Sequence, residues 1–228
     1  MMKIIFRSAK NHKSLFITNN SFNYSFKFIW AMIKIETLLA LGATYKEVIT
    51  NETIFEEGAE CHYYYELISG SVRWVHISEE GKEFIQDMIE PGECFGEFPL
   101  FDDGPYAASA IANTNSEILR LRKDSFQQLL KEEPLIHFSF SKLLVERLRF
   151  RFLLSKDLAR NKPEEKICSL LTYFKIHKKY FCPKCNLVQL TRQQIADMTG
   201  LRVETVIRSI RHLKETGKLQ IQKGKVYY

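Results

Sequence analysis

Between residues 51 and 121, glycines separate short β-prone stretches at nearly equal intervals. Gly58, Gly70, Gly81 and Gly92 lie 12, 11 and 11 residues apart. Short strands with turn residues at a spacing of about 8–12 positions are typical of a small antiparallel sandwich or barrel. The spacing therefore predicts an N-terminal antiparallel β-roll of the double-stranded β-helix or jelly-roll type.

One predicted strand of this β-roll, residues 71–77, has two distinct faces. Its sequence is Ser-Val-Arg-Trp-Val-His-Ile, and successive side chains of a strand point to opposite sides of the sheet. We therefore expect Val72, Trp74 and His76 on one face and Val75 on the other.

A long helix is predicted from Pro134 to about Arg160, because this stretch has proline only at its start and contains no glycine. Two neighbouring apolar stripes make its apolar face wider than one small β domain needs. We expect one stripe to pack on the β-roll and the other on a second copy of the helix, giving a homodimer through residues 134–160. Burial of the whole helix within one chain is the alternative. The stripes are Phe140, Leu144, Leu148 and Phe152, and Leu143, Phe150 and Leu154.

Charge is distributed unevenly along the chain. Residues 32–160 contain 14 basic and 22 acidic residues, whereas residues 161–228 contain 14 basic and 5 acidic residues. An acidic body followed by a basic C-terminal third is typical of a regulatory domain joined to a nucleic-acid-binding domain. No apolar run is long enough to cross a membrane. Five cysteines without an evident signal peptide favour the reducing cytoplasm.

Residues 1–31 form an atypical N-terminal extension. Asn, Lys, Phe, Ile and Tyr account for 18 of these 31 residues, and Gly, Pro, Asp and Glu are absent. AT-rich codons specify the same five amino acids. We hypothesise that the segment is not native to the protein and that Met32 is the native start. The alternative is a basic arm that contacts an anionic partner.

The basic third of the chain has the pattern of a helix-turn-helix. Residues 191–194, Thr-Arg-Gln-Gln, fit a capping box at the start of a helix that stops at Gly200. A second helix is expected from about residue 202 to 216. Two short alternating stretches in residues 217–228, with Lys-Gly between them, predict a β-hairpin that forms a wing.

The second helix presents one face suited to reading DNA. A major groove admits such a helix, and the N-terminal residues of the helix meet the base edges. Arg208 has the geometry to donate two hydrogen bonds to guanine, and Glu204 to accept one from cytosine. Val203 and Ile207 are expected to contact thymine methyl groups. The expected phosphate contacts are Thr191, Arg192, Gln193 and Arg211.

The order of these parts resembles the CRP/FNR family of bacterial transcription regulators over about residues 35–228. The strongest match is Leu-Thr-Arg-Gln-Gln-Ile-Ala at 190–196 together with Gly-Leu-Arg-Val-Glu-Thr-Val-Ile-Arg at 200–208. The resemblance implies an α+β chain that regulates transcription as a homodimer on double-stranded DNA, with RNA polymerase as a candidate partner. Its parts would be a cyclic-nucleotide-binding-like sensor domain in residues 32–133, a dimerisation helix in 134–160 and a winged helix-turn-helix in 161–228.

The same resemblance places an effector pocket between Gly96-Glu97 and the small residues that follow. In members that bind cyclic AMP, an arginine followed by serine or threonine holds the cyclic phosphate, but Ala107 and Ala108 match these positions. Without the guanidinium the phosphate lacks its bidentate partner, and Glu97 cannot hold an anion. We therefore expect an effector other than cyclic AMP, or none. A cyclic-nucleotide-responsive regulator with a non-standard phosphate cassette is the alternative. The candidate pocket residues are Gly96, Glu97, Phe98, Ala107 and Ala108.

The predicted recognition helix is similar to that of the FNR-type members. Val203, Glu204 and Arg208 match the Val-Glu-x-x-x-Arg pattern that reads TTGA-type half-sites in this family. The resemblance thus predicts a palindromic site with a TTG…CAA core. Ile207 replaces the serine often found there, which leaves the outermost base of the half-site open.

Two features outside these parts bear on cofactors and catalysis. Cys182 and Cys185 form a C-x-x-C pair that fits half of a zinc site, although the sequence shows no second pair. A redox dithiol and a structural turn with two incidental thiols are the alternatives, and we favour the turn. A cupin-like enzyme would need clustered metal ligands, and the barrel has only His62 and His76. We therefore assign no catalytic residue, no metal ligand and no cofactor.

Overall fold

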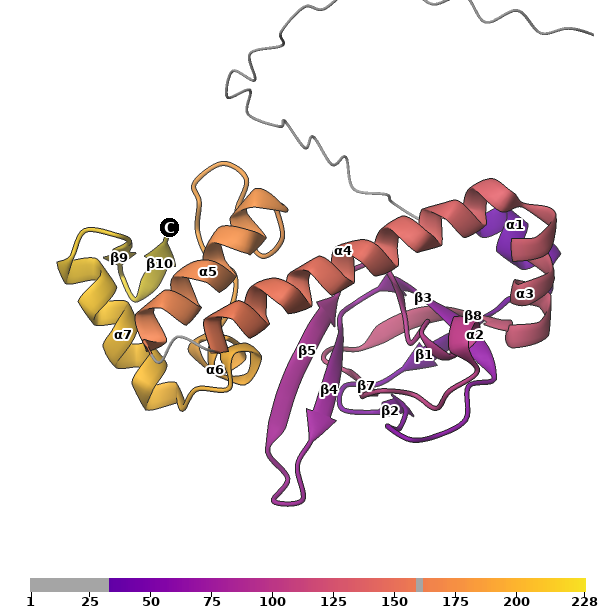
Figure 1. Ribbon diagram of the computed structural model, residues 1–228, viewed down its shortest axis with the longest axis horizontal. Coiled ribbons are helices and arrows are strands. Elements are labelled where there is room, and N and C mark those ends of the chain that lie inside the picture. Colours follow the sequence, from indigo (N-terminus) through magenta and orange to yellow (C-terminus); the bar gives the residue numbers. More distant parts are fainter. Residues whose placement is uncertain (1–32, 159–161) are drawn as a thin grey trace, which may run out of the picture.

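The computed structural model describes residues 33–158 and 162–228. It has a β domain and a helical domain, and one long helix extends across both (Figure 1). The hypotheses about residues 1–31 and Met32 lie outside the described residues. In the part of the chain that is described, no helix is long and apolar enough to span a membrane.

The β domain is the predicted β-roll, built from two four-stranded antiparallel sheets. Turns with a positive φ join several of its strands, and Gly70 shows why glycine is needed there. Its φ is +90°, and a Cβ atom at this position would lie 2.2 Å from the Ser116 Oγ atom. One sheet has the order β1 (Thr44–Val48), β8 (Ser116–Arg122), β3 (Tyr63–Ser69), β6 (Cys94–Phe95), and the other β2 (Thr53–Phe55), β7 (Ser109–Ala112), β4 (Val72–Ile77), β5 (Glu83–Ile89).

An aromatic cluster joins the β-roll to the helices at one end of the domain. The Tyr64 and Phe126 rings stack with centroids 4.7 Å apart, and the Phe140 ring meets Phe126 edge to face at 5.2 Å. All three side chains are buried, so this cluster anchors the start of the long helix to the sheet. The helices here are α1 (Ile35–Ala40), α2 (Pro99–Asp102), α3 (Lys123–Glu132) and the long α4 (Pro134–Leu158).

The two predicted stripes of α4 do not each stay on one side of the helix. Phe140 is fully buried against the β-roll, whereas Leu148 and Phe152 of the same stripe are 55% and 68% exposed. Each step of four residues rotates the position by about 40° beyond one turn, so a stripe at this spacing winds from the sensor domain towards solvent. Phe150, from the second stripe, packs on the C-terminal domain instead. The assignment of each stripe to one partner was therefore wrong.

The predicted alternation of β4 holds only for its first half. Val72 and Trp74 are buried as expected, but Val75 is also buried and His76 is exposed. A register shift between Trp74 and Val75 interrupts the pairing with β5. Val75 belongs to the same apolar cluster as the core of the helical domain, so the outer face of this hairpin is covered rather than solvent-exposed.

The C-terminal domain is the predicted winged helix-turn-helix. The capping box forms: the Thr191 hydroxyl accepts from the Gln194 amide at 3.1 Å, and the Gln194 side chain accepts from the Thr191 amide at 2.9 Å. Gly200, in the left-handed conformation with a φ of +67°, ends the first helix. The elements are α5 (Pro163–Ile176), α6 (Arg192–Thr199), α7 (Val203–Glu215), β9 (Gln220–Gln222) and β10 (Lys225–Tyr227).

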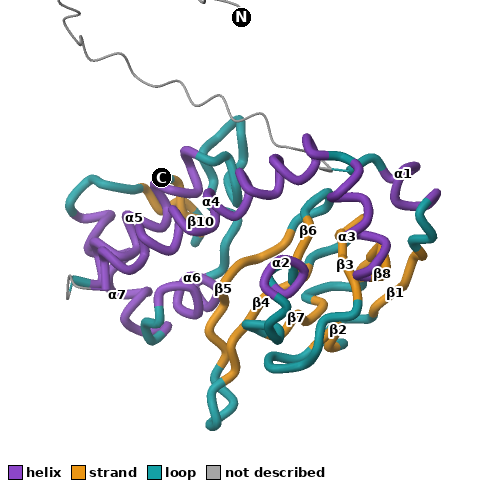
Figure 2. The backbone as a smooth tube through the Cα atoms, turned by 45° about the vertical axis from the view of Figure 1, so that its right-hand side comes forward, coloured by secondary structure: helices purple, strands orange, loops and turns teal. Residues whose placement is uncertain are grey.

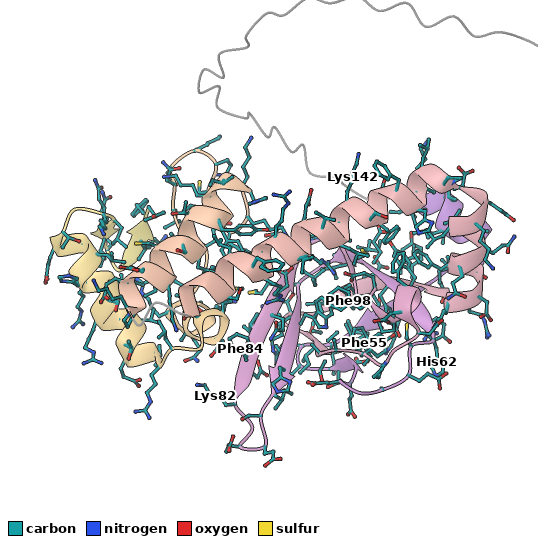
Figure 3. All side chains as sticks on the ribbon, viewed as in Figure 1. Phe55, His62, Lys82, Phe84, Phe98 and Lys142 are labelled. Atoms are coloured by element: carbon teal, nitrogen blue, oxygen red, sulfur yellow. The ribbon has the colours of Figure 1, made fainter. Side chains whose placement is uncertain are left out.

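The two domains are in contact through α6 and the β4–β5 hairpin (Figure 2). A Cβ atom at Gly200 would lie 3.7 Å from the Phe84 ring of β5, and Figure 3 shows Phe84 beside the helical domain. The Lys179 ammonium and the Glu93 carboxylate pair at 2.5 Å. The Tyr180 hydroxyl donates to the Met88 carbonyl. The β domain and the helical domain therefore share a packed and polar interface in this structure.

Candidate DNA-binding face and effector pocket

Helix α7 is strongly amphipathic, as its sequence predicts. The buried side chains Val206, Ile210 and Leu213 hold it in the domain core. The negative charge of Glu204, in the first turn, interacts favourably with the positive N-terminal end of the helix dipole. The positive charge of Lys214, in the last turn, interacts favourably with the negative C-terminal end. The helix has no side-chain N-cap, and the charged side chains of its outer face do not contribute to the domain core.

The four predicted base-reading residues lie on the outer face of α7. Glu204 and Arg208 are exposed, and Val203 and Ile207 are half-buried at its edges. Within residues 33–158 and 162–228, no hydrogen bond or ion pair engages the side chains of Glu204, Arg208 or Arg211. Charged side chains that are exposed and unpaired on a surface helix are available to bind an external polar ligand.

Three of the four predicted phosphate contacts also have structural roles. Thr191 caps α6, and a guanidinium nitrogen of Arg192 donates to the Gly224 carbonyl in the wing turn at 3.2 Å. The Gln193 amide donates to the Asp197 carboxylate at 2.8 Å. Arg211 remains exposed and uncommitted on α7. Of the residues expected to contact phosphate, those at the start of α6 are therefore held by hydrogen bonds within the domain, whereas Arg211 on α7 is not.

The pocket residues Gly96 and Glu97 follow β6 at the centre of the β-roll. Gly96 has a φ of +68°, and a Cβ atom there would lie 2.5 Å from the Phe55 ring. The tight approach turns the next residue inward, so that the Glu97 side chain is completely buried. Phe98 is half-buried and precedes α2, below α4 (Figure 3).

An arginine from the long helix contacts the predicted pocket residue Glu97. The Arg147 guanidinium donates to Glu97 Oε1 and, at 2.8 Å, to the Cys94 carbonyl. Burial opposes the positive charge of Arg147, but the Glu97 carboxylate outweighs it and raises the arginine pKa. Among the described residues, Glu97 Oε2 has no hydrogen-bond partner. The predicted pocket residue Glu97 therefore belongs to a buried ion pair in which one carboxylate oxygen has no partner among the described residues.

Trp74 lies beside the alanines of the pocket. Its indole N–H donates to the Ala108 carbonyl at 3.2 Å, and its ring centre is 5.0 Å from that of Phe98. The Arg147 guanidinium lies 5.4 Å above the indole. Ala108 is buried, whereas Ala107 is exposed. The indole of Trp74 thus lies next to Ala108, with the Arg147 guanidinium above its ring.

Sequence reasoning did not identify Arg147 and Trp74 as pocket residues. Arg147 is 50 positions from Glu97, and Trp74 is 34 positions from Ala108. No local pattern reports such distant contacts. The one local signal is an arginine among the apolar side chains of α4, and that pattern does not place the side chain inside the β domain.

Comparison with protein families and known proteins gives a consistent set of matches. A model described as the cyclic nucleotide-binding domain matches residues 45–133, and one described as the Crp-like helix-turn-helix domain matches residues 165–227. The cyclic AMP receptor protein of Thermus thermophilus is 32% identical over 177 residues, which cover 76% of this chain and 78% of the relative. The cAMP-activated global transcriptional regulator CRP of Pasteurella multocida is 30% identical over 168 residues, covering 73% and 80%.

Solved structures show the same fold at lower sequence identity. The c-di-GMP responsive global regulator CLP of Xanthomonas campestris has a TM-score of 0.69 at 23% identity, covering 85% of this chain and 96% of its own. FixK2 of Bradyrhizobium japonicum has a TM-score of 0.67 at 21% identity, covering 81% and 91%.

Proposed function

The chain belongs to the CRP/FNR family of DNA-binding transcription regulators, and from this premise we propose that it binds a palindromic DNA site as a homodimer without cyclic AMP as its effector. The observation that carries the proposal is the outer face of α7. Its charged side chains are exposed and have no partner in the described part of the chain. A regulator acting on chromosomal DNA would work in the cytoplasm, with RNA polymerase as a candidate partner.

Specificity would come from one turn of α7. Arg208 has the reach to bind a guanine through O6 and N7, and Glu204, one helical turn earlier, to accept from cytosine N4. Val203 and Ile207 flank the charges and offer apolar contacts to thymine methyl groups. This arrangement fits a TTG…CAA core, and the flanking Arg211 fits a phosphate contact that fixes the position of the helix.

The homodimer is supported by an exposed apolar stripe on α4. Phe138, Val145 and Phe152 are spaced by seven residues and are 50% to 68% exposed. Leu148 lies at the matching d position of the heptad and is 55% exposed. Apolar residues at a and d form the seam of a two-stranded coiled coil. The opposite face of the helix already packs on the sensor domain, so the stripe is free to pair with a second α4.

The proposal for the effector rests on Trp74 and the two alanines. A cyclic phosphate would meet no arginine at Ala107 or Ala108. The indole of Trp74 is buried and bonded to the Ala108 carbonyl, so it takes up space beside the phosphate cassette. A cyclic-nucleotide-responsive regulator with a non-standard cassette is the second candidate, favoured by the names of the curated relatives.

The DNA proposal is tested by selecting sites for the full chain from random duplexes. We expect enrichment of inverted TTG…CAA half-sites about one helical turn apart. Enrichment of a single, non-repeated site, or no enrichment over bulk DNA, would contradict the proposal.

The dimer is tested by sedimentation of the Leu148→Glu variant. A charge at the centre of the apolar seam should give monomers at micromolar protein and weaken binding to the palindrome. Ile49→Glu, at a site 68% exposed on the β-roll, is the matched control and should remain dimeric. Unchanged association of Leu148→Glu would place the dimer interface elsewhere.

Calorimetric titration with cyclic AMP and cyclic GMP tests the effector. No binding at micromolar nucleotide is expected. Micromolar affinity for either nucleotide would favour the second candidate.

A further inference from the structure

The connection between α5 and α6 contains a tight turn that begins at Cys182 and includes Cys185. The Asn186 amide donates to the Cys182 carbonyl at 3.0 Å, and the Cys182 amide donates to the Leu187 carbonyl at 2.9 Å. Asn186 has a φ of +57°, which redirects the chain after the turn. A bridge between Phe181 and Val188 closes the base of this turn, which we call the knuckle (residues 181–188).

The knuckle holds its two cysteines in a geometry that suits a disulfide. The Asn186 amide bonds to the carbonyl four residues earlier, so Cys182 and Cys185 are the first and fourth residues of a single helix-like turn. Residues three apart in such a turn are neighbours, with Cβ atoms roughly 5–6 Å apart. Disulfides join Cα atoms separated by roughly 4.4–6.8 Å. The bond therefore requires only a small movement of the backbone.

These two thiols differ from the other cysteines of the described chain. Cys185 is exposed and Cys182 is half-exposed, whereas Cys61 and Cys94 are buried. Cys168 is half-exposed like Cys182, but burial raises the pKa of its thiol. The Cys185 thiol, followed by the amides of Lys184 and Cys185, stabilises the Cys182 thiolate and lowers its pKa. Burial raises the pKa of Cys94. Reactive thiols are accessible to solvent and lose their proton at a lower pH than ordinary thiols. Both cysteines of the knuckle are accessible to solvent.

The segment around the knuckle is basic. Residues 175–186 contain four lysines and no acidic residue. The local charge favours a thiolate and attracts small anions. In the described residues, no third histidine, cysteine, aspartate or glutamate joins the pair in a cluster that could hold a metal ion. Two thiolates alone do not complete the four-ligand shell of zinc.

We propose that Cys182 and Cys185 form a redox-active dithiol that exchanges with small anionic disulfides of the glutathione type. The Cys182 thiolate attacks one sulfur of the small disulfide, forms a mixed disulfide and releases one thiolate. Cys185 then loses its proton, attacks the Cys182 sulfur and releases the second thiolate. The protein dithiol gives up two electrons and two protons, and the small disulfide is reduced to two thiols.

The knuckle is hydrogen-bonded to the wing, so its oxidation state would be transmitted there. The Val188 amide donates to the Val226 carbonyl of β10 at 2.9 Å, and the Tyr228 amide donates to the Asn186 carbonyl at 3.2 Å. Leu187 also bridges Tyr227. This coupling rests on the proposed DNA-binding function, whereas the thiol chemistry itself does not.

The thiol chemistry is tested on the full chain in glutathione buffers of graded redox ratio, followed by alkylation and mass spectrometry. We expect the peptides with Cys182 and Cys185 to become protected together, with loss of the mass of two hydrogen atoms. In Cys185→Ser, the mixed disulfide should accumulate at Cys182, roughly tenfold above the buried Cys61 of the same molecule. The matched Cys182→Ser variant should accumulate less at Cys185.

Three outcomes would overturn the proposal. In the first, both cysteines stay fully alkylated in oxidised glutathione. In the second, they are protected without loss of mass and freed by a chelator, which would assign them to a metal. In the third, the two serine variants accumulate equal amounts of mixed disulfide. For the coupling, we expect the DNA dissociation constants of the oxidised and reduced wild type to differ by roughly threefold, the effect of about one phosphate contact. Equal constants would overturn the coupling alone.

Discussion

The effector pocket and the outer face of α7 use the same kinds of side chain in opposite ways. In the pocket, Arg147 and Glu97 neutralise each other inside the β-roll, and Trp74 lies against them. On α7, Glu204 and Arg208 lie one helical turn apart at the surface, and neither has a partner among the described residues. The comparison separates charge that is satisfied within the chain, which is costly to unpair, from unpaired charge on a rigid helix, which is available to a ligand.

The largest expected effect is on stability, from Arg147→Ala. The change leaves the buried Glu97 carboxylate without its partner, and breaking a buried pair in this way costs about 3–5 kcal/mol. The free energy of unfolding, measured in urea, should fall by that amount. Arg149→Ala, which removes an exposed guanidinium from the same helix, is the control and should change it by less than about 0.5 kcal/mol. If the two substitutions lowered the free energy of unfolding equally, the paired Arg147 would not matter more to stability than the exposed Arg149.

A smaller effect is expected on DNA affinity from Arg211→Ala. Loss of one phosphate contact should weaken binding to all sequences alike and reduce the salt dependence of log K by about 1. Gel shifts at several salt concentrations measure this slope. An exposed arginine of the sensor domain provides the control: Arg122→Ala should leave the slope unchanged. A sequence-dependent loss on Arg211→Ala would mean that this residue reads bases.

The smallest effect is expected from Glu66→Gln in the β-roll. Burial raises the pKa of Glu66, whose Oε2 accepts from the Tyr64 hydroxyl at 2.8 Å and whose Oε1 has no partner in the described chain. The folded state then binds more protons than the unfolded state above the unfolded pKa, so this group lowers stability as pH rises through its folded pKa. Glu66→Gln should therefore gain stability relative to wild type as pH rises from 5 to 8.

The exposed Glu60→Gln serves as the control for this pH series. Its difference from wild type should stay constant across the range. If the advantage of Glu66→Gln were constant or fell with rising pH, the buried carboxyl would not be the source of the pH dependence.

The sequence predicted the helix-turn-helix well because its signals are local. A capping box spans four residues, and Gly200 ends the helix that Thr191 begins. The apolar and polar faces of α7 are also set by contacts within one small domain. The family resemblance and the β-roll followed from similarly short patterns, such as the glycine spacing.

The parts that sequence reasoning missed depend on contacts between distant segments. Helix α4 packs on the β-roll near its start and on the helical domain further along, and a third side of it is exposed. A single apolar stripe therefore cannot predict which of its residues are buried. Val75 is buried because the helical domain covers the outer face of β4. Arg147 reaches Glu97 only because α4 crosses the open side of the β-roll. Each of these features is fixed by the arrangement of the domains rather than by local periodicity.

The most direct test of the central claim is a binding cycle between Arg208 and the guanine of the TTG half-site. Arg208→Ala should weaken binding to the palindrome by about 1–3 kcal/mol per contact, and replacing that guanine should then cost the variant almost nothing further. Unfolding in urea should be unchanged, because Arg208 is exposed and unpaired within the described chain. If Arg208→Ala bound the same site with equal affinity and selectivity, α7 would not read DNA in the way proposed.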